Sequence, residues 1–281
     1  MSREMLLIKN FFAIRKRLGL ARLGRKRKAA ALPPASLKKK HQVTESTNLG
    51  FLLYEIRPEK FDKVIVYLHG GGYVNPIAKQ HWQLIEQLAD QTSSLVLVPR
   101  YGLAPEHNAS EALEFLSRVM GHAKSFGAEL ILAGDSAGGG LAVAAIQQLG
   151  IQNQVSKLIL ISPWVDSDFQ HIGMTEVEKH DPWLIPDNLR KIAAVWSGED
   201  THQDVKVSPL RGNFEGFPRT YLLIGQWDIF LFDCRLLRDK LLAQNVELDY
   251  EEIPEALHVY PLLPTPEGQS SRARIVEFIG R

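Results

Sequence analysis

Residues 130–140 read LILAGDSAGGG, and this stretch decides the fold. An apolar run of strand length leads into a serine between two glycines, and LAVAAI at residues 141–146, which favours a helix, follows at once. A strand, a sharp turn and a helix around G-x-S-x-G form a nucleophile elbow, in which a strained turn exposes the serine hydroxyl, here that of Ser136. Gly134 and Gly138 then lack side chains because strand and helix pass too close for a Cβ atom. By itself the pattern also fits a plain glycine turn.

Strand-like and helix-like patterns alternate along the rest of the chain. Short runs of β-branched and aromatic residues predict strands, and longer runs with apolar residues at helical spacing predict helices. Chains that alternate in this way form a mainly parallel sheet with helices on both faces, so the predicted class is α/β. The predicted strands are residues 43–47, 51–57, 64–68, 95–98, 130–133, 158–161, 221–224 and 246–253, and helices are predicted at 78–91, 109–126 and 267–280.

The composition suits a soluble globular protein with one large domain, or one domain and a small accessory piece. Of its 281 residues, 45% are hydrophobic and 23% are charged. No apolar run approaches the roughly 18 residues that a membrane-spanning helix needs. Cys234 is the only cysteine, which excludes an internal disulfide framework and any metal site built from several cysteines. This cysteine usage fits a reducing compartment, so we expect a cytoplasmic protein.

Positive charge is concentrated near the N-terminus. Residues 1–41 hold 13 Lys and Arg and one acid, Glu4, whereas the remaining residues hold 20 basic and 31 acidic side chains. Residues 4–20 combine this charge with apolar side chains at helical spacing, which predicts an amphipathic helix. We expect the helix to pack on its own protein, and contact of residues 1–28 with an anionic membrane surface is the alternative. Nucleic-acid binding is disfavoured because no aromatic residues lie between the charges of residues 22–40.

Residues 164–212 interrupt the alternation of strands and helices. They contain several prolines, few strand-like runs and three tryptophans, Trp164, Trp183 and Trp196. An insertion of this length is either a structural excursion or a lid that shapes a pocket. In a lid, these aromatic side chains would wall the space for the acyl or alcohol group of a substrate.

A second glycine-rich segment supplies candidate hydrogen-bond donors. A serine hydroxyl is a weak nucleophile at neutral pH, and it needs a base, an acid that orients the base, and donors for an oxyanion. HGGG at residues 69–72 directly follows the predicted strand 64–68, at the strand end where sites form in open α/β sheets. Glycines let backbone N–H groups point into a cavity. We therefore assign the amides of Gly71, Gly72 and Ala137 to an oxyanion hole, with His69 shaping the loop.

The acid is expected in the loop after the next-to-last strand. Residues 221–224 are followed by GQWD, so Asp228 lies just beyond a buried run. A structural role for Asp228 would be to cap the helix that follows. Asp233 is the competing acid, but it lies five residues further on, within that predicted helix.

The base is expected in the loop after the last strand. Of nine histidines, only His258 has this placement. His258 would take the proton of Ser136 and return it to a leaving alcohol. Asp228 would fix the tautomer of the imidazole and stabilise its charged form.

Together these motifs resemble the hormone-sensitive-lipase-like esterases, a branch of the α/β-hydrolases, over roughly residues 43–281. The chain order Ser136, Asp228, His258 is the order of that superfamily. The resemblance implies an α/β-hydrolase fold with a mostly parallel sheet of about eight strands. It also implies a serine carboxylesterase that hydrolyses short-chain esters through an acyl-enzyme, with no cofactor and no metal. The matching segments are HGGG at 69–72, YGLAPEH at 101–107, GDSAGG at 134–139, SPWVD at 162–166, Asp228 and His258.

The resemblance also implies a domain organisation. A small helical cap would be built from residues 1–40 and an insertion at about 166–210, on a hydrolase domain that spans residues 41–281. Asp135, beside the serine, is interpreted as support for the elbow. One position departs from the family, because most members carry arginine where this chain has Gly102.

Two alternatives to an esterase remain open at this point. An amidase or a deacetylase of small metabolites uses the same machinery, and leaving-group preference lies in pocket shape rather than in the triad. A non-catalytic small-molecule receptor on the same fold would lack a triad member, and here all three are present in order. The expected partner is a small-molecule ester, with no nucleic acid, and a homo-oligomer is possible.

Overall fold

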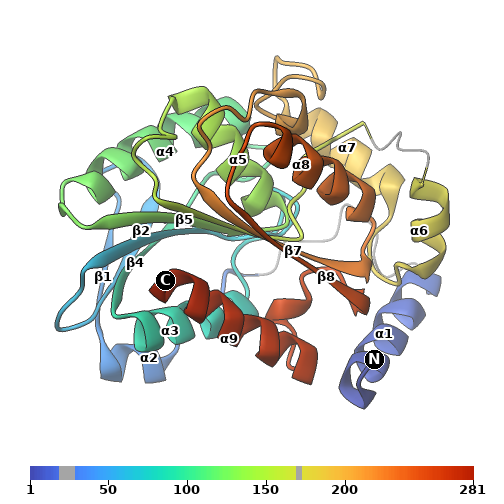
Figure 1. Ribbon diagram of the computed structural model, residues 1–281, viewed down its shortest axis with the longest axis horizontal. Helices are drawn as coiled ribbons and strands as arrows, with labels where there is room; N and C mark the ends of the chain where they lie inside the picture. Colours follow the sequence, from blue (N-terminus) through green and yellow to red (C-terminus); the bar gives the residue numbers. More distant parts are fainter. Residues whose placement is uncertain (19–28, 169–172) are drawn as a thin grey trace.

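The computed structural model of the chain describes residues 1–18, 29–168 and 173–281. Its centre is an eight-stranded sheet in the order β1-β2-β4-β3-β5-β6-β7-β8 (Figure 1). β1 and β2 form an antiparallel hairpin, β2 is antiparallel to β4, and all further pairs are parallel. The predicted α/β class and strand number are confirmed. The strands are β1 Gln42–Ser46, β2 Leu52–Arg57, β3 Lys63–Leu68, β4 Ser94–Arg100, β5 Glu129–Asp135, β6 Lys157–Ile161, β7 Arg219–Trp227 and β8 Leu248–Leu257.

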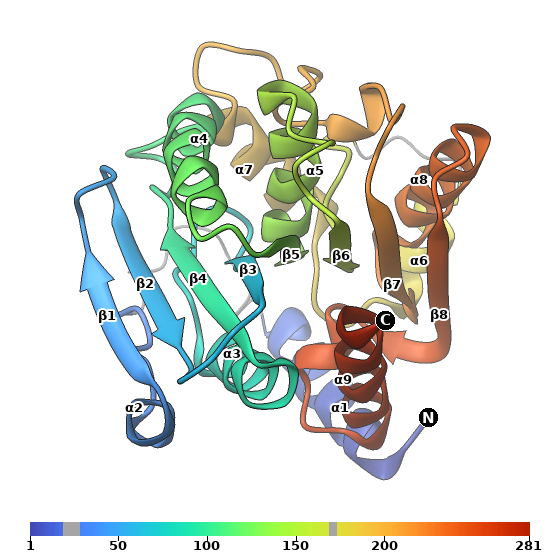
Figure 2. The same cartoon turned by 60° about the vertical axis from the view of Figure 1, so that its left-hand side comes forward.

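Helices cover both faces of the sheet. α3 and α9 lie on one face, and α4, α5 and α8 lie on the other (Figure 2). α6 and α7 belong to the predicted insertion between β6 and β7. No helix in the described ranges is long and apolar enough to cross a membrane. The helices are α1 Arg3–Arg17, α2 Ala35–Lys40, α3 Lys79–Thr92, α4 Ala109–Lys124, α5 Ala137–Leu149, α6 Met174–His180, α7 Pro186–Trp196, α8 Leu231–Ala243 and α9 Pro266–Gly280, with short 3-10 turns at Pro209–Arg211 and Tyr260–Leu262.

Two sequence predictions extend into residues outside the described ranges. The predicted basic N-terminal segment includes residues 19–28, and the predicted insertion includes residues 169–172 with His171. The described part of the N-terminal segment contains α1, which begins with the Ser2 side chain accepting a hydrogen bond from the Met5 amide (3.1 Å). Met5 is fully buried and packs against Ala256, Leu257 and Tyr260.

The sheet separates two hydrophobic cores. Successive side chains of a strand point to opposite faces. In β3, Val64, Val66 and Leu68 pack on the side of α4 and α5, whereas Ile65 and Tyr67 pack on the side of α3 and α9. All five are fully buried, which explains why the central strands are continuous apolar runs rather than alternating ones. Burial on both faces thus holds the central strands β3, β5 and β6 in place, together with the ends of these strands.

The last strand differs from its predicted bounds. β8 begins at Leu248 and continues to Leu257, past the predicted end at residue 253. The strand continues because an irregularity in its pairing with β7, between Gly225 and Trp227, brings Leu257 opposite Trp227. Glu255 takes a left-handed φ of 58° in this region. As a result, His258 follows the strand directly.

Glu251 joins β8 to α9 and to the turn after His258. Its carboxylate accepts hydrogen bonds from the hydroxyls of Tyr221 (2.5 Å), Tyr260 (2.5 Å) and Ser271, and it forms an ion pair with Arg274 (2.5 Å). Burial by itself raises the pKa of Glu251, but these bonds outweigh it and lower the pKa to about 2. The contribution of the ionised carboxylate to stability is therefore present above the ordinary pKa and is lost as the pH falls towards 2.

We expect Glu251→Gln to lower the free energy of unfolding at neutral pH by about 2 kcal/mol, because buried donors lose a charged acceptor. The same change should flatten the acid dependence of stability between the ordinary pKa and about pH 2. Urea unfolding at neutral and acid pH measures both effects. Glu277→Gln, on the exposed face of α9, is the matched control and should change stability by less than about 0.5 kcal/mol. Equal losses in the two variants would contradict the role given to Glu251.

Candidate active site

Ser136 lies in the tight turn between β5 and α5. Its backbone has φ 51° and ψ −120°, a strained conformation for a residue with a side chain. The close approach of strand and helix requires glycines, because a Cβ on Gly134 would collide with the carbonyl of Gly138, and a Cβ on Gly138 with that of Leu68. The turn is held by hydrogen bonds from the Ser136 amide to the Ile161 carbonyl and from the Trp164 amide to the Ser136 carbonyl (both 2.9 Å).

Three side chains predicted from separate loops meet at this turn. His258 Nε2 lies 3.0 Å from Ser136 Oγ, and His258 Nδ1 lies 2.8 Å from Asp228 Oδ2. A carboxylate only accepts hydrogen bonds, so the proton of the neutral imidazole is assigned to Nδ1. Nε2 is then free to accept from the serine hydroxyl. This is the arrangement in which a histidine can take the proton of a serine.

The charge balance of the site favours a histidine that gains a proton during reaction. Burial by itself lowers the pKa of His258, but the charge and hydrogen bond of Asp228 outweigh it and leave the pKa raised. The carboxylates of Asp181 and Asp135 act in the same direction. A raised pKa means that the protonated ring, the imidazolium, is stabilised. It also means that, on acidification, His258 becomes protonated and can no longer act as a base at a higher pH than an ordinary histidine would.

Asp228 has two structural partners, one for each carboxylate oxygen. Oδ2 faces His258, and Oδ1 accepts a hydrogen bond from the Phe230 amide (3.0 Å) in the turn before α8. The two roles weighed for Asp228 in the sequence are thus compatible. Asp233, the competing acid, lies in the first turn of α8, and within the described ranges no hydrogen bond joins it to His258. Burial, together with the charges of Asp166 and Asp228, raises the pKa of Asp233 to about 8.

The glycine-rich loop after β3 presents unused amides. Gly71 and Gly72 have φ values of 121° and 59°, in the region that favours glycine. Among the described residues, the amides of Gly71, Gly72 and Ala137 donate no backbone hydrogen bond. Ala137 opens α5, so its amide is one of those that a helix start leaves unpaired, at the positive end of the helix dipole. These three amides are available to an oxyanion.

Asp135 connects the elbow to the glycine-rich loop. Its Oδ1 accepts hydrogen bonds from the Tyr67 hydroxyl (2.7 Å) and the Gly70 amide (2.9 Å), and its Oδ2 lies 3.3 Å from His81 Nε2. His81 Nδ1 accepts from the Ala78 amide (2.9 Å), so the His81 proton is assigned to Nε2. Burial raises the pKa of Asp135, but the electrostatic interaction with His81 and these hydrogen bonds outweigh it and leave the pKa lowered. Sequence reasoning identified Asp135 as support and missed His81.

His69 is held as a part of the loop. Its Nδ1 donates to the Gly70 carbonyl (2.6 Å), and its ring stacks on Tyr101 (4.8 Å between centroids). Burial lowers the pKa of His69 to about 4, so the ring is neutral near pH 7. At the position of the family arginine, a Cβ on Gly102 would collide with His107. The His107 side chain fills the space that a larger residue would need.

Comparison with known proteins relates this geometry to a family. A family model described as alpha/beta hydrolase fold matches residues 65–262, well over half of the chain. The chain belongs to the α/β-hydrolase family. Acetyl-hydrolase from Streptomyces hygroscopicus is 30% identical over 235 residues, which cover 80% of this chain and 77% of that protein. Esterase LipU from Mycobacterium tuberculosis is 30% identical over 233 residues, 77% of either chain.

Solved structures agree with the predicted branch of this family. An esterase from the bacterial hormone-sensitive lipase family has a TM-score of 0.84 at 26% identity, covering 99% of this chain and 98% of that one. The structure of EstE5 soaked by p-nitrophenyl butyrate has a TM-score of 0.83 at 25% identity, with the same coverage. The predicted resemblance to hormone-sensitive-lipase-like esterases is confirmed.

Two aromatic rings contact the histidine of this α/β-hydrolase. Trp183 and Phe230 each make a T-shaped contact with His258, at 5.5 and 5.3 Å between ring centroids. Trp164 stacks on Phe230, and Trp196 stacks on Tyr73 of the glycine-rich loop (4.3 Å). Trp164 and Trp196 are fully buried and serve core packing. Trp183 is the tryptophan of the insertion that reaches His258.

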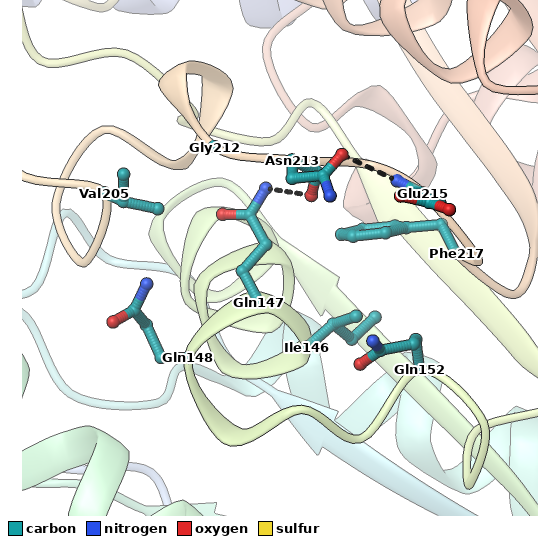
Figure 3. A pocket seen from close by; sticks show the side chains of 9 residues that line it. All are labelled: Ile146, Gln147, Gln148, Gln152, Val205, Gly212, Asn213, Glu215 and Phe217. Atoms are coloured by element: carbon teal, nitrogen blue, oxygen red, sulfur yellow. Dashed lines mark hydrogen bonds between the residues drawn. The ribbon is translucent and has the colours of Figure 1, made fainter.

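A separate hollow of about 280 Å³ lies near the far end of α5 from Ser136 (Figure 3). Gln147 donates from α5 to the carbonyls of Pro209 and Asn213 (both 3.1 Å) beside it. These bonds fasten the end of the insertion to the hydrolase core. The hollow is lined by Ile146, Gln147, Gln148, Gln152, Val205, Gly212, Asn213, Glu215 and Phe217.

No group of three or more His, Cys, Asp or Glu side chains in the described part of the hydrolase is arranged to hold a metal ion.

Proposed function

We propose that this hydrolase is a serine carboxylesterase that cleaves short-chain carboxylic esters through an acyl-enzyme at Ser136. The observation that carries the proposal is the pair of hydrogen bonds that join Asp228 to His258 and His258 to Ser136. Relatives named esterase and acetyl-hydrolase support an ester bond as the target. The proposed oxyanion donors are the amides of Gly71, Gly72 and Ala137.

The first half of the reaction forms the acyl-enzyme. Ser136 Oγ attacks the ester carbonyl carbon while its proton passes to His258 Nε2. The carbonyl oxygen becomes an oxyanion and accepts hydrogen bonds from the three amides of the oxyanion hole. When the tetrahedral intermediate collapses, the bond from carbon to the alcohol oxygen breaks. His258 gives its proton to that oxygen, and the alcohol leaves.

The second half returns the enzyme to its starting state. Water takes the place of the alcohol, and His258 Nε2 removes one of its protons as the water oxygen attacks the acyl carbon. The oxyanion hole stabilises the second intermediate in the same way. Its collapse breaks the bond to Ser136 Oγ, which recovers a proton from His258. The carboxylic acid is then released.

We further propose that residues 1–40 and about 166–210 form a cap over this site, on a hydrolase domain of residues 41–281. The position of a Cβ on Gly72 lies 3.8 Å from Ile192 of α7 and 4.0 Å from Trp164. Phe12 of α1 stacks on Trp183 (4.3 Å), which contacts His258. Ile192 and Trp183 of the insertion therefore lie beside the glycine-rich loop and His258, and Phe12 of α1 packs against Trp183. We expect apolar side chains so close to the reacting atoms to favour substrates with a short acyl chain.

The test is a series of p-nitrophenyl esters from acetate to palmitate, with Ser136→Ala as the blank. We expect the highest kcat/KM for acetate to butyrate and a decline for longer chains. Matched p-nitroanilides and acetylated sugars separate an esterase from an amidase or a deacetylase. A rate on amides above that on esters, or no turnover of any ester above the blank, would overturn the proposal.

A second proposal concerns the outer face of α1, which we propose binds an anionic membrane surface. Successive helical residues turn by about 100°, so Leu7, Phe11, Ile14 and Leu18 form one stripe. These four side chains are 55–69% exposed. Arg15 borders the stripe on one side, and Arg3 and Arg17 border it on the other. Apolar residues between arginines are the pattern of a helix that lies in an anionic lipid interface. A cytoplasmic location, which the single cysteine favours, would make this surface the inner leaflet.

Vesicle sedimentation tests the role of α1. We expect binding to vesicles that contain phosphatidylglycerol, and at least tenfold weaker binding after Leu7→Asp/Ile14→Asp, because the stripe loses apolar area and meets negative charge. Leu236→Asp/Leu242→Asp, at exposed sites of α8, is the matched control and should bind as the wild type does. Equal binding of all three proteins would contradict the proposal. So would a stable dimer by light scattering that only the α1 variant loses, since the stripe would then join two copies.

A further inference from the structure

Asp181 is a buried carboxylate that the proposed mechanism does not use. It follows α6 in the insertion, and it is 2% exposed. All its carboxylate contacts in the described ranges are with backbone amides. Oδ1 accepts from Trp183 (2.7 Å) and Leu184 (2.9 Å), and Oδ2 accepts from Ile229 (3.0 Å). A buried carboxylate that accepts hydrogen bonds from three backbone amides holds the segments that carry those amides in place relative to one another.

The bond to Ile229 fixes the turn that carries the proposed acid. Ile229 follows Asp228 directly and lies 48 residues from Asp181 in the chain. The turn is otherwise closed from within, by bonds from the Asp228 amide to the Gly225 carbonyl (3.2 Å) and from the Leu231 amide to the Asp228 carbonyl (2.9 Å). In the part of the chain that the structure describes, the hydrogen bond of Asp181 fastens this turn to the insertion.

The bonds to Trp183 and Leu184 orient an aromatic side chain against the proposed base. They close a tight turn at residues 181–184, from which the Trp183 ring meets His258 in a T-shaped contact (5.5 Å, 74°). Phe12 of α1 stacks on the same ring with an interplanar angle of 6°. Lys16 of α1 donates to the Asp181 carbonyl (2.8 Å). Figure 1 shows α1 beside α6, at the end of the sheet formed by β7 and β8.

The charge of Asp181 acts on the same histidine. Burial, together with the negative charge of Asp228, raises the pKa of Asp181 to about 6, so the carboxylate is largely ionised above neutral pH. Asp181 in turn helps to raise the pKa of His258. The groups that face it are Asp228 and His258 from the strand ends and Lys16 from α1, whose ammonium is bound to the Asp181 carbonyl.

We infer that Asp181 is a positioning residue of the esterase, one that fixes the Asp228 turn and the Trp183 ring and places a negative charge beside His258. The inference rests on the proposed function. It assigns Asp181 two separable effects, one of geometry and one of charge. Geometry acts on kcat through the alignment of the triad. Charge acts on the pH at which His258 becomes protonated.

Two substitutions separate these effects. Asp181→Asn keeps the size and one acceptor oxygen but turns an NH2 group towards the Ile229 amide and removes the charge. We expect kcat on p-nitrophenyl butyrate to fall about tenfold to a hundredfold with little change in KM. The acid limb of kcat/KM should move to lower pH, because His258 loses a stabilising charge. Asp181→Glu keeps the charge on a longer side chain, so kcat should fall while the acid limb stays in place.

Asp204→Asn is the matched control, since Asp204 lies in the same insertion and also caps a backbone turn, at the Lys206 amide (2.9 Å). It should leave kcat and the acid limb as in the wild type. Wild-type kcat in Asp181→Asn, or an acid limb that shifts as far in Asp181→Glu, would overturn the inference. If Asp181→Asn does not fold, Asp181→Glu decides, because wild-type kcat in that variant, or an acid limb that moves to lower pH, would overturn the inference. An inactive wild type would instead overturn the proposed function.

Discussion

Ser136→Ala is expected to lower kcat on p-nitrophenyl butyrate by about 10⁶-fold, because the substitution removes the attacking atom. The aromatic side chains around His258 and the oxyanion amides stay in place, so substrate should still bind. Residual turnover above the uncatalysed rate would come from those amides alone. Steady-state kinetics on purified protein, with the uncatalysed hydrolysis subtracted, measures the effect.

The control for this variant is Ser156→Ala. Ser156 donates its hydroxyl to Glu129 and to the Leu130 carbonyl at the opposite end of β5, away from the site. We expect wild-type kcat from Ser156→Ala and unfolding transitions close to that of the wild type from both variants. Loss of less than about a hundredfold in Ser136→Ala would mean that another residue carries the chemistry.

Asp228→Asn is expected to lower kcat by about 10⁴-fold while the protein stays folded. An amide NH2 group at the position of Oδ2 would face the Nδ1–H of His258. The imidazole would then carry its proton on Nε2 instead, and in this tautomer Nε2 cannot accept from Ser136. The pH profile supplies a second readout. Asp228 raises the pKa of His258, so its loss lowers that pKa, and the acid limb of kcat/KM moves to lower pH.

Asp233→Asn is the matched control for Asp228→Asn. Asp233 lies five residues away, is equally buried, and has a pKa raised to about 8, so its carboxyl is largely neutral near pH 7. Replacing a neutral carboxyl with a neutral amide should leave kcat within a few fold of the wild type. A larger loss in Asp233→Asn than in Asp228→Asn would transfer the role of the acid to Asp233.

The sequence predicted those parts of the fold and site that depend on local pattern and on chain order. A strand that runs into G-x-S-x-G and then into a helix predicts a sharp turn at Ser136, and the loops that carry the other candidate residues favour an elbow over a plain glycine turn. Asp228 and His258 each follow a buried run, and the carboxyl ends of parallel strands meet at one edge of a sheet. Local signals of this kind were sufficient to place the three residues near one another before any contact was known.

Contacts between residues far apart in the chain had no such signal. His81 lies in an ordinary amphipathic helix, and only the fold brings it to Asp135, 54 residues away. In the sequence, Asp181 is a polar residue in a proline-containing loop. Its hydrogen-bond partner Ile229 lies 48 residues further along the chain, beyond β7. The extension of β8 was hidden by Pro254, because proline is rarely found within a strand. A pairing irregularity with β7 allows the strand to continue.

Covalent labelling tests the central claim most directly. The wild type is treated with a fluorophosphonate, its mass is measured intact, and the modified peptide is sequenced by mass spectrometry. We predict one adduct per chain on Ser136, loss of esterase activity in proportion to labelling, and no adduct on Ser136→Ala. An active protein that takes up no label, or that loses activity through an adduct on another residue, would contradict the assignment of Ser136 as the nucleophile.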